Sequence, residues 1–157
     1  MRENSKMLNK SLFSSNTCIW STPQDFFDKI NKEFHFDIDV CALPENAKCS
    51  RYFTPEDDGL TQDWGRYDTI WCNPPYGKDI TKWIAKAYTT SHTYGNTIVM
   101  LLPARTDTKA FHEYIYKKSE IRFLKGRLKF GEGVNSAPFP SMLVIFKGKS
   151  ERIQSEV

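Results

Sequence analysis

The sequence lacks the long apolar segments that would place a protein in a membrane or direct it out of the cell. No apolar run approaches the ~20 residues that a membrane-spanning helix needs. Residues 1–10 are polar and charged, where a secretory signal would carry an apolar stretch. We therefore expect a protein that stays in the cytoplasm and does not insert into membranes.

Cysteine pairs of the kind that hold a metal ion or a disulfide framework are lacking as well. Cys18, Cys41, Cys49 and Cys72 are widely spaced, with no CxxC pair and no histidine at zinc-finger spacing. We expect these cysteines to be reduced thiols, and we expect no metal site.

A large excess of charge of either sign is also missing. The formal net charge is +3, which permits a nucleic-acid partner without requiring one.

The 157 residues suffice for one domain but not for two, and no repeat or linker divides them. We expect one domain over residues 18–148, between a flexible polar arm at 1–17 and a flexible polar tail at 149–157.

Apolar periodicity predicts strands that alternate with helices. Thr22 is placed to cap a first helix, with Pro23 in its first turn. The expected strands are residues 34–41, 67–72, 96–102, 120–124, 127–130 and 141–146, and further helices are expected over residues 80–88 and 107–118. This order predicts an α/β fold, a mixed and mostly parallel sheet with helices on both faces.

Two polar residues fall at the carboxyl ends of predicted strands. Asp39 lies near the end of the strand within residues 34–41, and Asn73 directly follows the strand at 67–72. Open α/β sheets bind their ligands beyond the carboxyl ends of their strands. We therefore expect Asp39 and Asn73 to border one site.

The tetrapeptide Asn73-Pro74-Pro75-Tyr76 indicates chemistry on an amine. Its prolines stiffen the backbone and leave their carbonyl oxygens free to accept. The side-chain oxygen of Asn73 and the carbonyl of Pro74 are then placed to accept both N–H groups of an aromatic amine, so that its lone pair can attack a methyl group. The ring of Tyr76 would stack on a base turned out of the duplex.

A longer series of segments resembles the phage-type DNA N6-adenine methyltransferases over about residues 20–147. The segments are Trp20-Ser-Thr22-Pro23, Phe36-Asp-Ile-Asp39-Val-Cys41-Ala42, Asn46-Ala-Lys48-Cys49, Asp58-Gly59-Leu60, Asp63-Trp64, Asn73-Pro-Pro-Tyr76, Leu102-Pro-Ala-Arg105-Thr-Asp107-Thr, Gly126-Arg127-Leu-Lys-Phe130 and Pro140-Ser141. The resemblance implies a Rossmann-like methyltransferase domain that uses S-adenosylmethionine to methylate adenine in double-stranded DNA, in a host cytoplasm if a phage encodes it. It also implies that residues 73–76 are catalytic.

The resemblance specifies the residues that contact the cofactor less completely than the catalytic residues. It implies contacts from Trp20, Thr22, Pro23, Asp39, Cys41 and Ala42. The glycine-rich turn of most methyltransferases is absent, and Cys41-Ala42-Leu43-Pro44 takes its place. Carboxylates can accept from ribose hydroxyls or from the cofactor amine, which adds Asp57 and Asp58 as candidates; the other interpretation of this pair is an exposed acidic turn.

Basic residues gather in the last third of the sequence. Arg105, Lys125, Arg127 and Lys129 are candidates for holding DNA phosphates, and Phe139 is a candidate wedge between bases. A solvated basic surface and a simple hairpin connection are the alternatives.

Three other functions fit parts of the pattern. An RNA adenine is a second possible substrate, and the same tetrapeptide serves glutamine methylation in proteins. A DNA-binding module without enzymatic activity would bind no S-adenosylmethionine.

Overall fold

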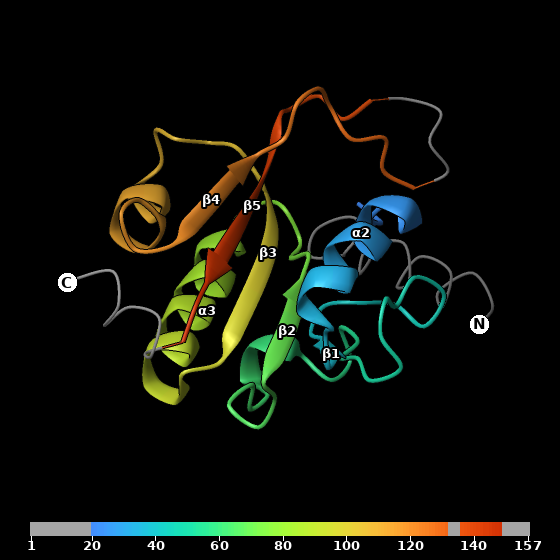
Figure 1. Cartoon of the computed structure of the whole chain (residues 1–157), viewed down its shortest axis with the longest axis vertical. Coiled ribbons are helices and arrows are strands. Elements are labelled where there is room, and N and C mark those ends of the chain that lie inside the picture. The colour runs from blue at the N-terminus through green and yellow to red at the C-terminus, as the bar shows by residue number, and fades with distance from the viewer. Residues whose placement is uncertain (1–19, 132–135, 149–157) are drawn as a thin grey trace, which may run out of the picture.

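The computed structural model describes residues 20–131 and 136–148 (Figure 1). Its elements are helix α2 (Gln24–Phe34), strand β1 (Ile38–Asp39), a 3₁₀ turn η1 (Gly59–Thr61), strand β2 (Thr69–Cys72), helix α3 (Ile80–Tyr94), strand β3 (Thr97–Pro103), a π-helical turn η2 (Phe111–Ile115), and strands β4 (Glu120–Phe123) and β5 (Ser141–Phe146). None of the helices in these ranges is both long enough and apolar enough to cross a membrane. The expected arm at 1–17 and tail at 149–157 lie outside the described residues.

The strands form one mixed sheet in the order β1-β2-β3-β5-β4. The first three strands pair in parallel, whereas β5 is antiparallel to both β3 and β4. Only β5 therefore runs against the other strands of this sheet. The expected mixed α/β sheet is confirmed, and β1, β2 and β3 end at the same edge.

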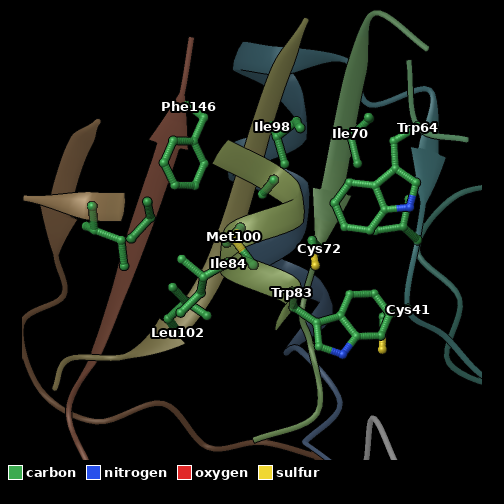
Figure 2. Close-up of a cluster of buried hydrophobic side chains, with 14 of the residues drawn as sticks. Cys41, Trp64, Ile70, Cys72, Trp83, Ile84, Ile98, Met100, Leu102 and Phe146 are labelled. Carbon is green, nitrogen blue, oxygen red and sulfur yellow. The ribbon is translucent and has the colours of Figure 1, made fainter. Parts of the chain in front are cut away.

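Alternate residues of the strands point to opposite faces of the sheet, and each face carries helices. On one face Ile70 and Cys72 of β2 and Met100 of β3 pack with Trp83 and Ile84 of α3 (Figure 2). This face also holds η2. The sequence of β3 is apolar on both sides because helices cover both sides.

The opposite face packs against α2. Phe27 and Ile30, which form the buried stripe of this helix, meet Trp71 of β2 and Val99 and Leu101 of β3. The segment between β4 and β5 arches over the edge where β2 and β3 end, towards the start of α2 (Figure 1). A backbone hydrogen bond from Gly131 to the carbonyl of Ser21 joins the two. This edge of the sheet is therefore covered by two segments, the one that precedes α2 and the one between β4 and β5.

Three expected elements differ from the structure. The expected strand at 127–130 does not form, because this segment binds the loop that returns to β5, where the Ala137 amide donates to the Leu128 carbonyl. The expected helix at 107–118 is reduced to the turn η2, in which Tyr116 donates to the carbonyl five residues earlier, and Lys117 follows with a φ of 61°. The strand expected within 34–41 is shortened to β1.

Candidate active site

Asn73 stands at the centre of the edge where the parallel strands end. It directly follows β2 and is 5% exposed. Its side-chain nitrogen donates to the backbone carbonyl of Trp20 and, at 3.1 Å, to the hydroxyl oxygen of Thr22. Thr22 was expected to cap α2, and this expectation is wrong: the hydroxyl oxygen accepts from Asn73 instead, and the helix begins after Pro23.

The side-chain oxygen of Asn73 is buried and has no hydrogen-bond partner within the described part of the chain. A buried acceptor without a partner costs on the order of 1–3 kcal/mol relative to a satisfied one. Because both N–H groups are occupied by acceptors, the amide orientation is fixed by its neighbours and the oxygen is the atom that faces away from them. The site therefore holds an acceptor ready for an external donor.

Tyr76 ends the tetrapeptide within a cluster of four rings. The cluster consists of Trp20, Tyr76, Phe130 and Phe139, and we call it the aromatic cluster. The ring centroids of Trp20 and Tyr76 are 6.5 Å apart, with an interplanar angle of 23°. The ring of Phe139 meets that of Tyr76 edge-on, with 5.4 Å between the centroids. The Tyr76 hydroxyl donates to the carbonyl of Leu101 in β3 at 2.9 Å, and burial raises its pKa well above the usual value. That anchor, which no sequence pattern indicated, fixes the ring.

Asp39 is 2% exposed, so it is not a solvated strand end. Its two oxygens accept from the backbone amides of Cys41 at 3.2 Å and Lys48 at 3.0 Å. Burial raises its pKa from 3.8 to about 7, against the opposing effect of these hydrogen bonds. The carboxyl group thereby holds the loop that replaces a glycine-rich turn.

A narrow polar pocket joins Asp39 to Asn73. The two residues line it together, as their positions at strand ends predicted. Lys48 also lines this pocket, and its Nζ donates to Gln24 of α2 at 2.9 Å. Its other lining residues are Ser21, Thr22, Cys41, Asn46 and Trp71. Lys48 and Asn46 belong to the resembling segments, but no chemical pattern had marked them as site residues.

A second cavity of about 350 Å³ opens beside this pocket, and Cys41 borders both. Its walls combine apolar side chains with a few charged groups; they are Val40, Cys41, Phe53, Thr54, Pro55, Asp58, Gly59, Leu60, Pro75, Asp79, Lys82 and Trp83. Asp58 reaches the cavity from a left-handed backbone with φ of 54°, whereas the carboxylate of Asp57 accepts from Thr54 in an exposed turn. Ala42 is buried next to this wall.

The cysteines differ in state. Cys49 and Cys72 are free, and burial raises the pKa of each. Cys41 is disulfide-bonded, so the expectation of reduced thiols is wrong at this residue.

A third cavity, of about 420 Å³, lies on the α3 side of Tyr76. Tyr76 and Phe139 border it, Arg105 and Thr108 supply polar groups, and apolar side chains from α3, β3 and η2 line much of the rest. Phe139 is buried here against Tyr76. The site thus combines an unpartnered acceptor, a fixed aromatic ring and cavities on either side of them.

Comparison with known proteins assigns this arrangement to a family. The sequence profile of the family described as DNA N-6-adenine-methyltransferase (Dam) matches residues 10–156. The chain belongs to this family. A DNA N-6-adenine-methyltransferase of Haemophilus phage HP1 (strain HP1c1) is 33% identical over 153 residues, which cover 92% of this chain and 87% of the relative.

Two more relatives match shorter stretches. A DNA N-6-adenine-methyltransferase of Escherichia phage T1 is 32% identical over 112 residues, 70% of this chain and 46% of that protein. The putative methyltransferase YfdM of Escherichia coli (strain K12) is 38% identical over 63 residues, 36% of this chain and 69% of that protein. The family expected from the sequence is confirmed, and membership makes the chain an adenine-specific DNA methyltransferase with DNA as its substrate.

The basic side chains of the protein differ in whether they already form hydrogen bonds or ion pairs within it. Arg105, Lys125 and Lys129 are not buried, and Arg127 places one guanidinium nitrogen 3.4 Å from the carbonyl of Ala137. Three of the four belong to the segment between β4 and β5 that roofs the site. Arg122, by contrast, is paired with Glu33 at 2.6 Å and with Glu120 at 2.8 Å.

Proposed function

We propose that the chain transfers the methyl group of S-adenosylmethionine to the N6 amine of an adenine extruded from double-stranded DNA, at residues 73–76. The observation that carries this proposal is the buried, unpartnered side-chain oxygen of Asn73. The target amine supplies two N–H donors, and a site that methylates it must accept from them without offering competing donors. The Asn73 oxygen meets this requirement because its amide nitrogen is already bound.

In the proposed reaction Asn73 and Pro74 orient the amine. The Asn73 oxygen accepts one N–H and the Pro74 carbonyl accepts the other, which draws the nitrogen out of conjugation with the ring. When bound, S-adenosylmethionine supplies an electrophilic methyl group on a sulfonium that leaves as a neutral thioether. The amine lone pair forms the new N–C bond as the C–S bond breaks, and the methylated amine then loses one proton to water. The work of the protein is positioning and polarisation.

The residues around Asp39 and Asp58 fit the cofactor. The narrow polar pocket, of about 10 Å³, cannot enclose an amino-acid portion, but the acidic group and the Lys48 ammonium that line it suit the two charged ends of such a portion. The neighbouring 350 Å³ cavity offers apolar walls for an adenine and the Asp58 carboxylate for ribose hydroxyls. Trp20, Pro23, Cys41 and Ala42 are the further contacts that the resemblance implied for this region. Both carboxylates already accept a hydrogen bond, Asp58 from the Leu60 amide and Asp57 from Thr54, but only Asp58 lines this cavity, which makes Asp57 the weaker candidate.

The third cavity and the basic segment between β4 and β5 support the proposal that DNA is bound at this site. The extruded adenine would enter the 420 Å³ cavity beside Tyr76 and Phe139, whose rings replace the stacking that it loses in the duplex. Arg105, at the cavity wall, and the basic residues 125, 127 and 129 would hold the flanking phosphates.

The test is methyl transfer by the Asn73→Ala variant, with Asn96→Ala as its matched control. Asn96 is similarly buried, its nitrogen donates to the carbonyls of Trp64 and Tyr67, and its oxygen is likewise unpartnered in the described chain, but it precedes β3 at the opposite edge. With labelled cofactor and unmodified duplex DNA, we expect Asn73→Ala to lose N6-methyladenine formation, measured by mass spectrometry of nucleosides, while it still binds cofactor. Asn96→Ala should lose comparable stability and keep its turnover number.

Three outcomes would overturn the proposal. Equal losses of turnover in both variants would mean that the effect is on folding. Loss of cofactor binding together with activity in a folded Asn73→Ala protein would remove its role as amine acceptor. Methyl incorporation by the wild-type protein into RNA or protein, and none into duplex DNA, would refute the proposed substrate.

A further inference from the structure

The amide of Asn73 can face the substrate in two ways. Rotation by half a turn about its last side-chain bond exchanges the oxygen and the nitrogen with almost no change in shape. Only the oxygen can accept from an amine, so one orientation supports the proposed reaction and the other opposes it. What holds the amide in the productive orientation is therefore part of the site.

Two acceptors hold the nitrogen on the side away from the substrate. They are the carbonyl of Trp20 and the hydroxyl oxygen of Thr22, which is 4% exposed. In the reversed orientation the Asn73 oxygen would face the Trp20 carbonyl, which cannot donate. The Trp20 carbonyl therefore biases the equilibrium by about five- to tenfold. The Thr22 hydroxyl can donate as well as accept, so its hydrogen bond fixes the position of the amide.

The segment that carries both acceptors is itself fixed from three directions. Gly131 donates to the carbonyl of Ser21 at 2.9 Å, Asn46 donates to the hydroxyl of Ser21 at 3.0 Å, and Phe27 in α2 donates to the carbonyl of Pro23 at 3.0 Å. Trp20 is also held by its ring in the aromatic cluster. The Thr22 hydroxyl is thus a fixed point relative to β2.

We propose that Thr22 is a positioning residue, whose hydroxyl binds the Asn73 amide nitrogen and, together with the Trp20 carbonyl, holds the amide so that its oxygen faces the substrate amine. This inference rests on the proposed function of Asn73. It differs from the role in cofactor contact that the family resemblance implied for Thr22. A cofactor ligand acts on cofactor affinity, whereas a positioning residue for Asn73 acts on turnover when the cofactor is saturating.

Three variants separate the two roles. Thr22→Val keeps the shape and removes the acceptor, and Thr22→Ser restores it. Thr69→Val is the matched control, because Thr69 begins the same strand β2 and loses a hydrogen bond to the carbonyl of His35 at the opposite end. The measurements are kcat at saturating cofactor, the cofactor Kd by calorimetry, and nuclear magnetic resonance of the Asn73 side-chain amide in the cofactor-free protein.

We expect Thr22→Val to lower kcat about tenfold and to change the cofactor Kd less than about twofold. Its Asn73 amide protons should exchange with water about five- to tenfold faster than in the wild-type protein. Thr22→Ser should restore both values to within about threefold, and Thr69→Val should leave them unchanged.

The positioning role is overturned if Thr22→Val keeps its kcat and weakens the cofactor Kd, or if Thr22→Ser fails to restore the Asn73 amide signal. The amide exchange is independent of the reaction. If the wild-type protein methylates no adenine, the proposed function fails, while the amide exchange still reports whether Thr22 orients Asn73.

Discussion

The buried carboxyl group of Asp39 predicts how the stability of this domain depends on pH. In the folded protein the pKa of Asp39 is about 7, because burial disfavours its charged form, and in an unfolded chain it returns to about 3.8. Between these values the folded state holds a proton that the unfolded state has lost. The free energy of unfolding therefore falls as pH rises from about 4 to 7, and the contribution is constant outside this window.

The size of this effect follows from the distance between the two pKa values. A rise from 3.8 to about 7 corresponds to about 4 kcal/mol between the ends of the window. The assay is urea denaturation of the wild-type protein and of Asp39→Asn at several pH values from about 4 to 8, which span this window. Other titrating groups affect both proteins equally, so the difference between the two curves isolates Asp39.

The carboxamide introduced by Asp39→Asn cannot titrate, so the variant should lack this fall in stability. Its absolute stability should be lower at acid pH, because a carboxamide nitrogen would face one of the backbone amides of Cys41 and Lys48 and cannot accept from it. Parallel pH profiles for the two proteins would refute the reasoning and would mean that Asp39 is ionised in the folded state throughout this range.

Other predictions concern the DNA side of the site. Tyr76→Phe removes the hydrogen bond to Leu101 and should lower stability by about 1 kcal/mol in denaturation experiments, with most methyl transfer retained. Tyr76→Ala leaves a hole in the aromatic cluster and should lower the free energy of unfolding by about 3–5 kcal/mol. With 2-aminopurine in place of the target adenine, this variant should also lose the fluorescence quenching that marks capture of the base by an aromatic ring. An unaltered fluorescence signal would exclude the Tyr76 ring as the stacking platform. Neutralising Lys125, Arg127 and Lys129 together should reduce the salt dependence of DNA binding by about one unit of slope per lost phosphate contact, whereas an unchanged slope would assign these charges to a solvated surface.

The elements that the sequence predicted well are those whose pattern reports directly on burial. The amphipathic spacing of α3 fits a helix that packs one face against the sheet, and the continuous apolar run of β3 fits a strand between two helical layers. The alternation at residues 127–130 is satisfied differently. Leu128 and Phe130, which is a member of the aromatic cluster, pack on the α2 face without a neighbouring strand, so the alternation that predicted a strand belongs to a folded-back loop.

Within the site, the shared edge of Asp39 and Asn73 was predictable, because parallel strands must end together. The partners of Asn73 were not, since its hydrogen bonds to Trp20 and Thr22 span more than 50 residues of sequence and leave no periodic signal. The sequence also could not show which of the adjacent carboxylates, Asp57 or Asp58, borders the cofactor site. In the structure Asp58 has a left-handed backbone and lines the cavity, whereas the Asp57 carboxylate accepts from Thr54.

An unpartnered buried oxygen does not by itself identify an active site, and Asn96 shows why. Like Asn73, Asn96 uses its nitrogen to bind two acceptors and leaves a buried oxygen without a partner in the described chain. It ties the loop before β2 to the start of β3, where strands begin, and the cavities that border the tetrapeptide do not reach it. Asn73 has the same chemistry at the edge where strands end, in a tetrapeptide that all three cavities border. The difference between the two residues is therefore the presence of bordering cavities that a ligand could occupy, and the paired Ala variants test whether this difference decides activity.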